Sequence, residues 1–283
     1  MRLGTIALIL LTITTALPAD DNLAQDGVEN AAEDVADDVA ENPAKAEDKV
    51  RGISRLFFFI SFVLTAVIIV LIIIEKVKQA SARERLRLLE AAASELGLSV
   101  RPEGDSTLQE ELSPFPLFNI GRSREMRNLI VADTPEVSLL IFDYKYIPLS
   151  DKEGRDRWQT VVAVRSPELQ IPTFHLYPEG FFSKIGSGLG GQDIDFDDHP
   201  EFSNAFVLKS EAEDETRDFF DQPLLDFFAK HPDITVEARP GTILYFRSRK
   251  RIDRIEPTAT DLRKFMEEGL QAFHAVRDRA LND

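Results

Sequence analysis

A run of 19 uncharged residues near the N-terminus constrains this chain more than any other feature. The run covers residues 56–74 (LFFFISFVLTAVIIVLIII), and 16 of its members are Leu, Ile, Phe or Val. As a helix it would be about 28 Å long, close to the ~30 Å hydrocarbon core of a bilayer. The insertion energy of so many apolar side chains outweighs the cost of one central charge. The run therefore predicts a transmembrane helix, residues 53–75, and not the buried helix of a soluble core.

Two segments precede this helix. Residues 1–19 contain one Arg, an apolar stretch and small residues before two Asp, which predicts a secretory signal peptide; an uncleaved anchor is the alternative. Residues 20–52 form the second segment, and its first part, residues 20–41, has nine acidic residues and no Lys or Arg. Such a composition predicts an acidic disordered spacer, with a basic partner as the alternative.

The order of these segments predicts the topology. A signal peptide exports the N-terminus, and the transmembrane helix then stops transfer. An uncleaved anchor gives two crossings and the same orientation of the C-terminus. We therefore expect a cytoplasmic C-terminal domain after a single pass, with the N-terminal segment outside. The Lys and Arg residues flanking the helix favour this orientation only weakly.

Residues 76–97 predict a juxtamembrane helix, because they are rich in helix-forming residues and end at Gly97. Leu86, Leu89, Ala93 and Leu96 form one apolar stripe, which either docks on the following domain or pairs with a second copy. Docking is favoured, since the stripe is short for a coiled coil. Cations of this helix are candidates for contact with lipid headgroups. They are Lys76, Lys78, Arg83, Arg85 and Arg87.

The remaining residues, 98–283, predict one α+β domain with a mainly antiparallel sheet and covering helices. Val137–Ile147 is apolar on both faces at first, as expected for a central strand. The other expected strands are Asn128–Ala132, Arg157–Arg165, Phe174–Tyr177, Ala205–Lys209, Ile234–Ala238 and Thr242–Arg247, the last two forming a hairpin. A capping box at Ser210–Glu213 predicts the start of a helical region, and the last helix should begin near Thr258 or Thr260.

The acidic segment 193–201 is the sharpest local feature of this domain. As a strand, it would place Asp193, Asp195 and Asp197 on one face, where with His199 or Glu201 they could hold Mg²⁺, Mn²⁺ or Ca²⁺. In the simpler interpretation, which we favour, the aspartates face water while Ile194 and Phe196 face the core. We therefore expect no metal site and no cofactor.

Three other patterns carry less weight. The glycines of residues 186–191 match a dinucleotide-binding pattern, but the acidic residues that follow would repel phosphate. Arg247, Arg249 and Arg251 would share one strand face, either for an anionic partner or to protect an edge strand. The four His show no metal-ligand spacing, and no catalytic motif is present.

Composition excludes several classes of function. The chain has a net charge of −16, so general nucleic-acid binding is not expected. It has no Cys, which excludes disulfides, thiolate nucleophiles and Cys-based metal sites.

Several short motifs together look familiar. They are Gln159-Thr160-Val161, Pro172-Thr173-Phe174, Tyr177-Pro178-Glu179, Asp193-Ile194-Asp195-Phe196 and His199-Pro200-Glu201-Phe202-Ser203. From about Ala82 to its end, the chain resembles uncharacterised bacterial membrane-anchored proteins with one soluble domain of unknown function after a membrane helix. This resemblance implies a bacterial inner-membrane protein. It implies no catalytic residue, since that family has no assigned activity.

The sequence thus favours a membrane-tethered cytoplasmic module that binds a partner and is not an enzyme. The membrane is the expected partner, together with a protein partner or a second copy of the chain. The alternative is a metal-dependent hydrolase that uses the segment 193–201.

Overall fold

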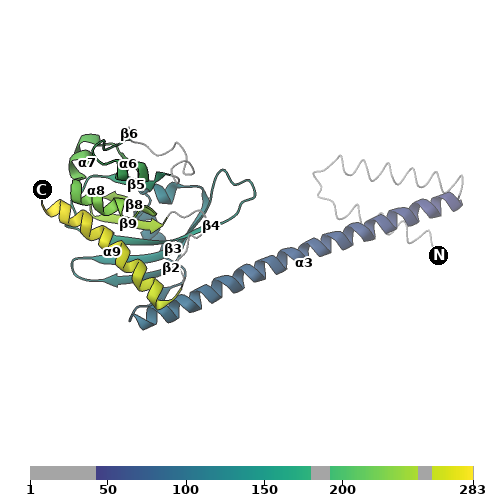
Figure 1. Cartoon of the computed structure of the whole chain (residues 1–283). Helices are drawn as coiled ribbons and strands as arrows, with labels where there is room; N and C mark the ends of the chain where they lie inside the picture. The colour runs from purple at the N-terminus through teal and green to yellow at the C-terminus, as the bar shows by residue number, and fades with distance from the viewer. Residues whose placement is uncertain (1–42, 180–191, 248–256, 283) are drawn as a thin grey trace. The chain divides into compact units, whose positions relative to one another are not determined.

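The structure is a computed structural model, and it describes residues 43–179, 192–247 and 257–282 (Figure 1). The chain divides into two compact units, Met1–Gln79 and Ala80–Asp283. The predicted signal peptide, the Gly-rich residues 186–191, Arg249 and Arg251 lie outside the described residues, as does most of the predicted acidic spacer.

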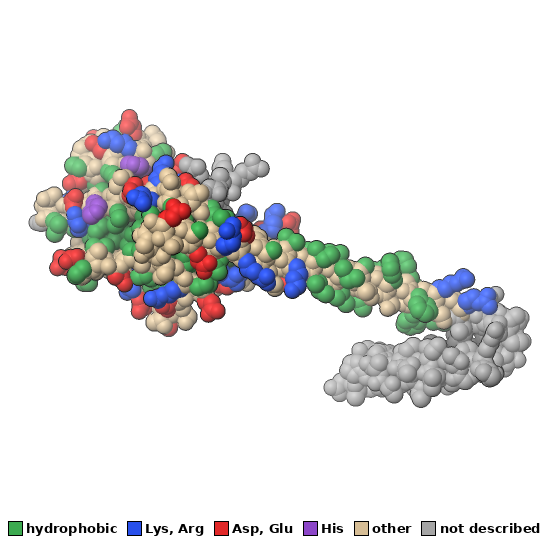
Figure 2. All heavy atoms as spheres, turned by 90° about the horizontal axis from the view of Figure 1, so that it is seen from below, with side chains coloured by type: hydrophobic (Ala, Val, Ile, Leu, Met, Phe, Trp, Pro, Cys, Tyr) green, Lys and Arg blue, Asp and Glu red, His purple; other side chains and the backbone are tan. Residues whose placement is uncertain are grey.

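The first unit contains most of helix α3, Pro43–Glu95. The large apolar side chains of residues 56–74 are exposed along this helix, and they form the continuous apolar surface of Figure 2. Among the described residues, this is the one helix long and apolar enough to cross a membrane. The predicted transmembrane and juxtamembrane segments form one helix. It begins at Pro43, so residues 43–52 are helical and not disordered as predicted.

The second unit is an α+β domain, as predicted. Its described residues form a nine-stranded antiparallel sheet with the order β1-β2-β3-β4-β9-β8-β5-β7-β6. The strands are β1 Val100–Arg101, β2 Arg122–Asp133, β3 Ser138–Ile147, β4 Arg157–Arg165, β5 Phe174–Pro178, β6 Gln192–Asp193, β7 Phe206–Ser210, β8 Ile234–Arg239 and β9 Thr242–Arg247.

Helices cover both faces of this sheet, because the central strands are apolar on both sides. One face packs against the end of α3 and against four further helices, the longest of which is α9 (Figure 1). The other face packs against α4 and the short 3₁₀ helix η1. The covering helices are α4 Ser106–Glu111, η1 Pro116–Asn119, α6 Pro200–Ala205, α7 Glu213–Phe219, α8 Gln222–Ala229 and α9 Ala259–Leu281.

The predicted docking of the juxtamembrane stripe is confirmed. Leu89 and Ala93 are buried, and Leu96 packs against the core cluster that α9 also covers. The helix ends where Gly97 adopts a positive φ of 73°, which a residue with a side chain rarely adopts. The domain therefore includes the last turns of α3 as part of its core.

Two local predictions are wrong. Ser210 does not cap a helix: it ends β7, and its hydroxyl donates to the Thr173 carbonyl at 2.8 Å. Strand β9 is not at an edge but lies between β4 and β8, and Arg247 pairs with Glu268 of α9. The predicted start of the last helix is confirmed, since the Thr258 hydroxyl accepts a hydrogen bond from the Asp261 amide.

Candidate functional site

A buried ion pair joins the last part of α3 to the sheet. The Arg85 guanidinium donates from Nε and from Nη2 to the two carboxylate oxygens of Asp143 on β3, at 2.6 and 2.7 Å. The Arg85 and Asp143 side chains are 10% and 1% exposed. This bidentate geometry is the strong form of an Arg–carboxylate contact.

The sheet is built to hold the Asp143 carboxylate. Asn128 has a positive φ of 54° at an irregularity of β2, and its side-chain amide donates to Asp143 at 2.8 Å. The Thr160 hydroxyl of β4 donates to the other carboxylate oxygen at 3.0 Å. Asp143 thus accepts hydrogen bonds from α3, β2 and β4, which offsets the cost of burying its charge.

This pair changes the assignment of one predicted lipid contact. Arg85 is buried and paired inside the domain, so the prediction that it contacts lipid headgroups is wrong. Lys76, Lys78 and Arg83 are exposed, and Arg87 is exposed beside Glu84, which it contacts at 2.8 Å. For these four residues, lipid contact stays a prediction.

A second buried charge lies on the face of the sheet that η1 covers. Glu237 of β8 is fully buried, and both of its carboxylate oxygens accept from the Leu117 amide of η1, at 3.0 and 3.1 Å. The Tyr177 hydroxyl of β5 donates to it at 2.9 Å. Burial raises the pKa of the Glu237 carboxyl to about 7, although these hydrogen bonds favour its charged form.

Other buried polar groups lie on the same face of the sheet. The register pairs Glu237 with His175, and burial beside Arg239 lowers the pKa of His175 to about 4. The Tyr144 hydroxyl and the Gln159 amide nitrogen are buried without a hydrogen bond within the described residues. Glu237, Tyr177 and Tyr144 thus form a buried polar cluster on this face.

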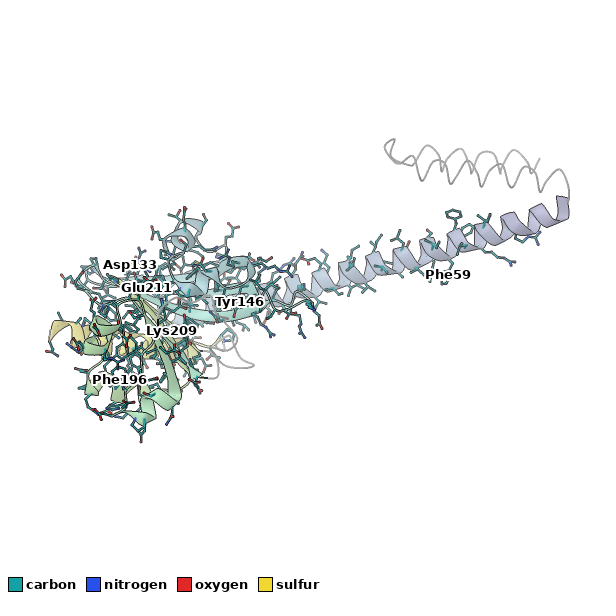
Figure 3. The ribbon with its side chains drawn as sticks, turned by 90° about the horizontal axis from the view of Figure 1, so that it is seen from above. Phe59, Asp133, Tyr146, Phe196, Lys209 and Glu211 are labelled. Carbon is teal, nitrogen blue, oxygen red and sulfur yellow. The ribbon has the colours of Figure 1, made fainter. Side chains whose placement is uncertain are left out.

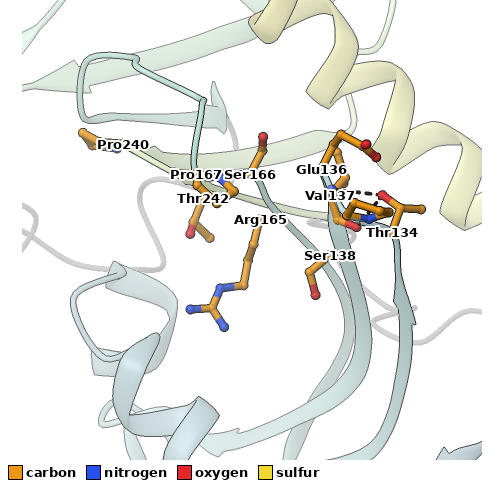
Figure 4. Close-up of a pocket in the computed structure, with 11 residues that line it drawn as sticks. Thr134, Glu136, Val137, Ser138, Arg165, Ser166, Pro167, Pro240 and Thr242 are labelled. Carbon is orange, nitrogen blue, oxygen red and sulfur yellow. Dashed lines mark hydrogen bonds between the residues drawn. The ribbon is translucent and has the colours of Figure 1, made fainter.

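A pocket with a volume of about 490 Å³ lies at one end of the sheet (Figure 4). Three segments line it: the turn between β2 and β3, the end of β4, and the turn between β8 and β9. The lining residues are Thr134, Pro135, Glu136, Val137, Ser138, Arg165, Ser166, Pro167, Pro240, Gly241 and Thr242. Its size is typical of a site for a small ligand or a short peptide segment.

Local hydrogen bonds fix the walls of this pocket. Thr134 and Val137 close the β2–β3 turn, since the Thr134 hydroxyl donates to the Val137 carbonyl and accepts from its amide, both at 3.0 Å. The Ser166 amide donates to Gly241, whose φ of 79° suits the turn. Arg165 extends along the pocket and pairs with Glu111 of α4 at 2.9 Å. The lining set offers hydroxyls, one guanidinium and one carboxylate.

The acidic segment does not form the predicted carboxylate face. Strand β6 ends at Asp193, which pairs with Lys209 of β7 at 2.9 Å, and Asp197 lies in a turn. Ile194 is buried and Phe196 packs against the core, as the simpler interpretation predicted. Among the described residues, no three His, Cys, Asp or Glu are grouped closely enough to hold a metal ion.

The two buried charges are the residues that sequence reasoning missed. The ion pair left a signal in the sequence: Asp143 directly follows the apolar residues 139–142 of β3, and Arg85 lies one helical turn before Leu89 of the docking stripe. The chain matches no protein-family model, no curated protein and no solved structure.

Proposed function

We propose that this chain is a membrane-tethered binding module. The observation that carries the proposal is helix α3: its residues 56–74 expose large apolar side chains, while its last turns pack into the core of the domain. A soluble protein rarely exposes such a long apolar surface. Anchoring through residues 56–74, with the last part of α3 fixed to the sheet by Arg85, accounts for both halves of the helix.

The pocket in Figure 4 is the proposed binding site. It lies at the end of the sheet where β4 ends at Arg165, and strand β3 leads from this end toward Asp143, where Arg85 binds. The pocket therefore lies at the Ser138 end of β3, and Tyr146 lies toward the other end of this strand. Proline rings, main-chain groups and a guanidinium suit a polar ligand with an anionic group, or a protein segment of that kind.

The orientation is part of the proposal. We propose a single pass through the inner membrane of a bacterium, with the N-terminal segment outside and the domain in the cytoplasm. The order of a signal sequence and one stop-transfer helix supports this orientation.

A topology test has a clear expected result. Alkaline phosphatase fused after Asp283 should be inactive in a bacterial host, and a fluorescent protein at the same position should be bright, because the C-terminus stays inside. The protein should also resist extraction of membranes with alkaline carbonate. As a control, replacing Ile68 and Ile69 with Lys should release it, since each central Lys costs about 3 kcal/mol of insertion. Strong phosphatase activity would contradict the proposed orientation.

Site-specific photo-crosslinking tests the binding site. A photoreactive residue in place of Glu136, at the pocket, should give a discrete adduct in cells. The same residue in place of Glu211 should not, since Glu211 is an exposed acid outside the pocket (Figure 3). Equal adducts at the two positions would contradict the assignment of the pocket. Replacing Arg165 with Ala should weaken the adduct at position 136, because it removes the guanidinium of the pocket.

A further inference from the structure

The β3–β4 loop, residues 148–156, lies at the end of the domain from which α3 emerges. Arg85 reaches Asp143, and after α3 ends the chain returns so that Val100 pairs with Ile130. Ile130 in turn pairs with Ile141, which is nearer than Asp143 to the start of β3. After Arg85, helix α3 therefore runs toward the start of this strand. Residues before Arg85 therefore lie toward the end of β3, which Tyr146 marks in Figure 3.

The covalent chain keeps this end of the domain close to the apolar run. Only five residues, 75–79, separate Ile74 from Ala80. Even fully extended, five residues span less than about 18 Å. A bilayer that holds residues 56–74 must therefore lie within this reach of Ala80, the first residue of the domain.

The loop exposes an apolar side chain near its start. Leu149 is 80% exposed, and apart from Leu281 it is the only exposed large apolar side chain among the described residues of 80–282. The loop is nevertheless held in place: the Asp151 amide donates to Pro148, and the buried Asp151 carboxylate pairs with Arg155 at 3.2 Å. An ordered loop that holds a leucine outward is suited to inserting it into another apolar phase.

Four cations and three acids lie in the loop, at the start of β4 and at the neighbouring start of β2, in a chain with a net charge of −16. The cations are Arg122, Lys152, Arg155 and Arg157, and the acids are Asp151, Glu153 and Asp156. Arg155 pairs with Asp151 and Glu153, and Arg157 lies 3.9 Å from Asp151. Figure 2 shows Lys and Arg side chains mixed with Asp and Glu over the surface of the domain.

The single tryptophan of the chain lies at the same end. Trp158 is the second residue of β4 and is partly exposed, with the Lys145 ammonium 5.6 Å from its ring centre. Tryptophan beside a cation is typical of side chains at the membrane interface.

We propose that the β3–β4 loop is a second membrane contact, in which Leu149 enters the interface of an anionic bilayer and the surrounding cations bind lipid headgroups. The inference rests on the proposed anchoring by residues 56–74. With two contacts, the domain would be held in one orientation on the bilayer, with the pocket directed toward the aqueous phase.

A single-cysteine probe in the full chain tests this contact. The chain has no native Cys, so Leu149→Cys can carry an environment-sensitive fluorophore at a unique position. The matched control is Glu168→Cys, an exposed position beyond the opposite end of β4. Both proteins are reconstituted into vesicles of phosphatidylcholine with phosphatidylserine, and into vesicles of phosphatidylcholine alone. The emission of Trp158 verifies that both variants are folded.

In anionic vesicles, the probe at position 149 should shift to shorter wavelength and be quenched by nitroxide-labelled lipid, while the probe at position 168 should show neither effect. High salt, or vesicles of phosphatidylcholine alone, should reduce the effect, because headgroup attraction is screened or absent. If the protein cosediments with vesicles but the two probes respond alike, the loop contact is wrong and the anchoring stands. If the protein does not cosediment, the anchoring itself is wrong. Equal quenching in neutral and anionic vesicles would reject the role of the cations.

Discussion

Replacing Asp143 with Ala should lower the free energy of unfolding of the domain by about 3–5 kcal/mol, because it removes one partner of a buried ion pair. The Arg85 guanidinium would stay largely buried, with no carboxylate to balance its charge. The Asn128 amide and the Thr160 hydroxyl would also lose the acceptor that they share.

Trp158 gives a direct measurement of this effect in the full chain. Because it is the only tryptophan, its fluorescence in detergent or lipid reports unfolding of the domain and not of the membrane helix. The matched control is Arg87→Ala on the same helix, whose partner Glu84 is exposed. Exposed pairs contribute at most about 1 kcal/mol, so this variant should unfold almost as the parent does.

A double variant separates the ion pair from simple loss of packing. Arg85→Met with Asp143→Leu removes both charges and keeps apolar volume, so it should recover much of the stability lost in Asp143→Ala. If Asp143→Ala destabilises the domain no more than Arg87→Ala does, the pair does not hold α3 to the sheet.

The sequence predicts the fold well where a local pattern controls it. The run 137–147 became β3, the turn at Arg239-Pro240-Gly241 became the β8–β9 hairpin, and Thr258 caps α9. In each case the decisive interactions are close in sequence: apolar side chains that must be buried, a turn residue or a cap.

The parts that were not predicted depend on distant partners. Arg85 and Asp143 are 58 residues apart, and Leu117 and Glu237 are 120 residues apart. In the sequence, Arg85 is one of several cations that follow the apolar run. The sequence alone does not show whether such a cation faces lipid headgroups or binds a buried carboxylate. Likewise, an alternating charge pattern at Arg247 suggests an edge strand, but α9 covers it with Glu268. Only the three-dimensional pairing of the strands decides between these alternatives.

Replacing Glu237 with Gln should make the domain more stable at pH 8 than the parent, by up to about 3 kcal/mol. Burial raises the pKa of the Glu237 carboxyl to about 7, whereas its value in the unfolded chain is near 4.5. Between these two values the folded protein keeps a proton that the unfolded chain has released. The free energy of unfolding therefore falls as the pH rises from about 4.5 to 7, at 1.36 kcal/mol for each unit of the pKa difference.

The glutamine variant removes this titration. Its neutral amide resembles the protonated carboxyl, and its oxygen can still accept hydrogen bonds from the Leu117 amide or the Tyr177 hydroxyl. The difference between variant and parent should therefore be small near pH 4.5, grow through the window up to pH 7, and stay constant above it. Denaturant titrations at several pH values, followed by Trp158 fluorescence, measure this difference directly.

Two variants test the cause of the pH dependence. Glu211→Gln changes an exposed carboxylate outside this cluster, so its stability relative to the parent should not vary across the same pH range. Tyr177→Phe removes a hydrogen bond that favours the charged form of Glu237, so the pKa of the carboxyl should rise and the loss of stability should extend to higher pH. A constant difference between Glu237→Gln and the parent at all pH values would mean that Glu237 is already ionised at pH 5. In that case, the hydrogen bonds from η1 and Tyr177 would outweigh burial.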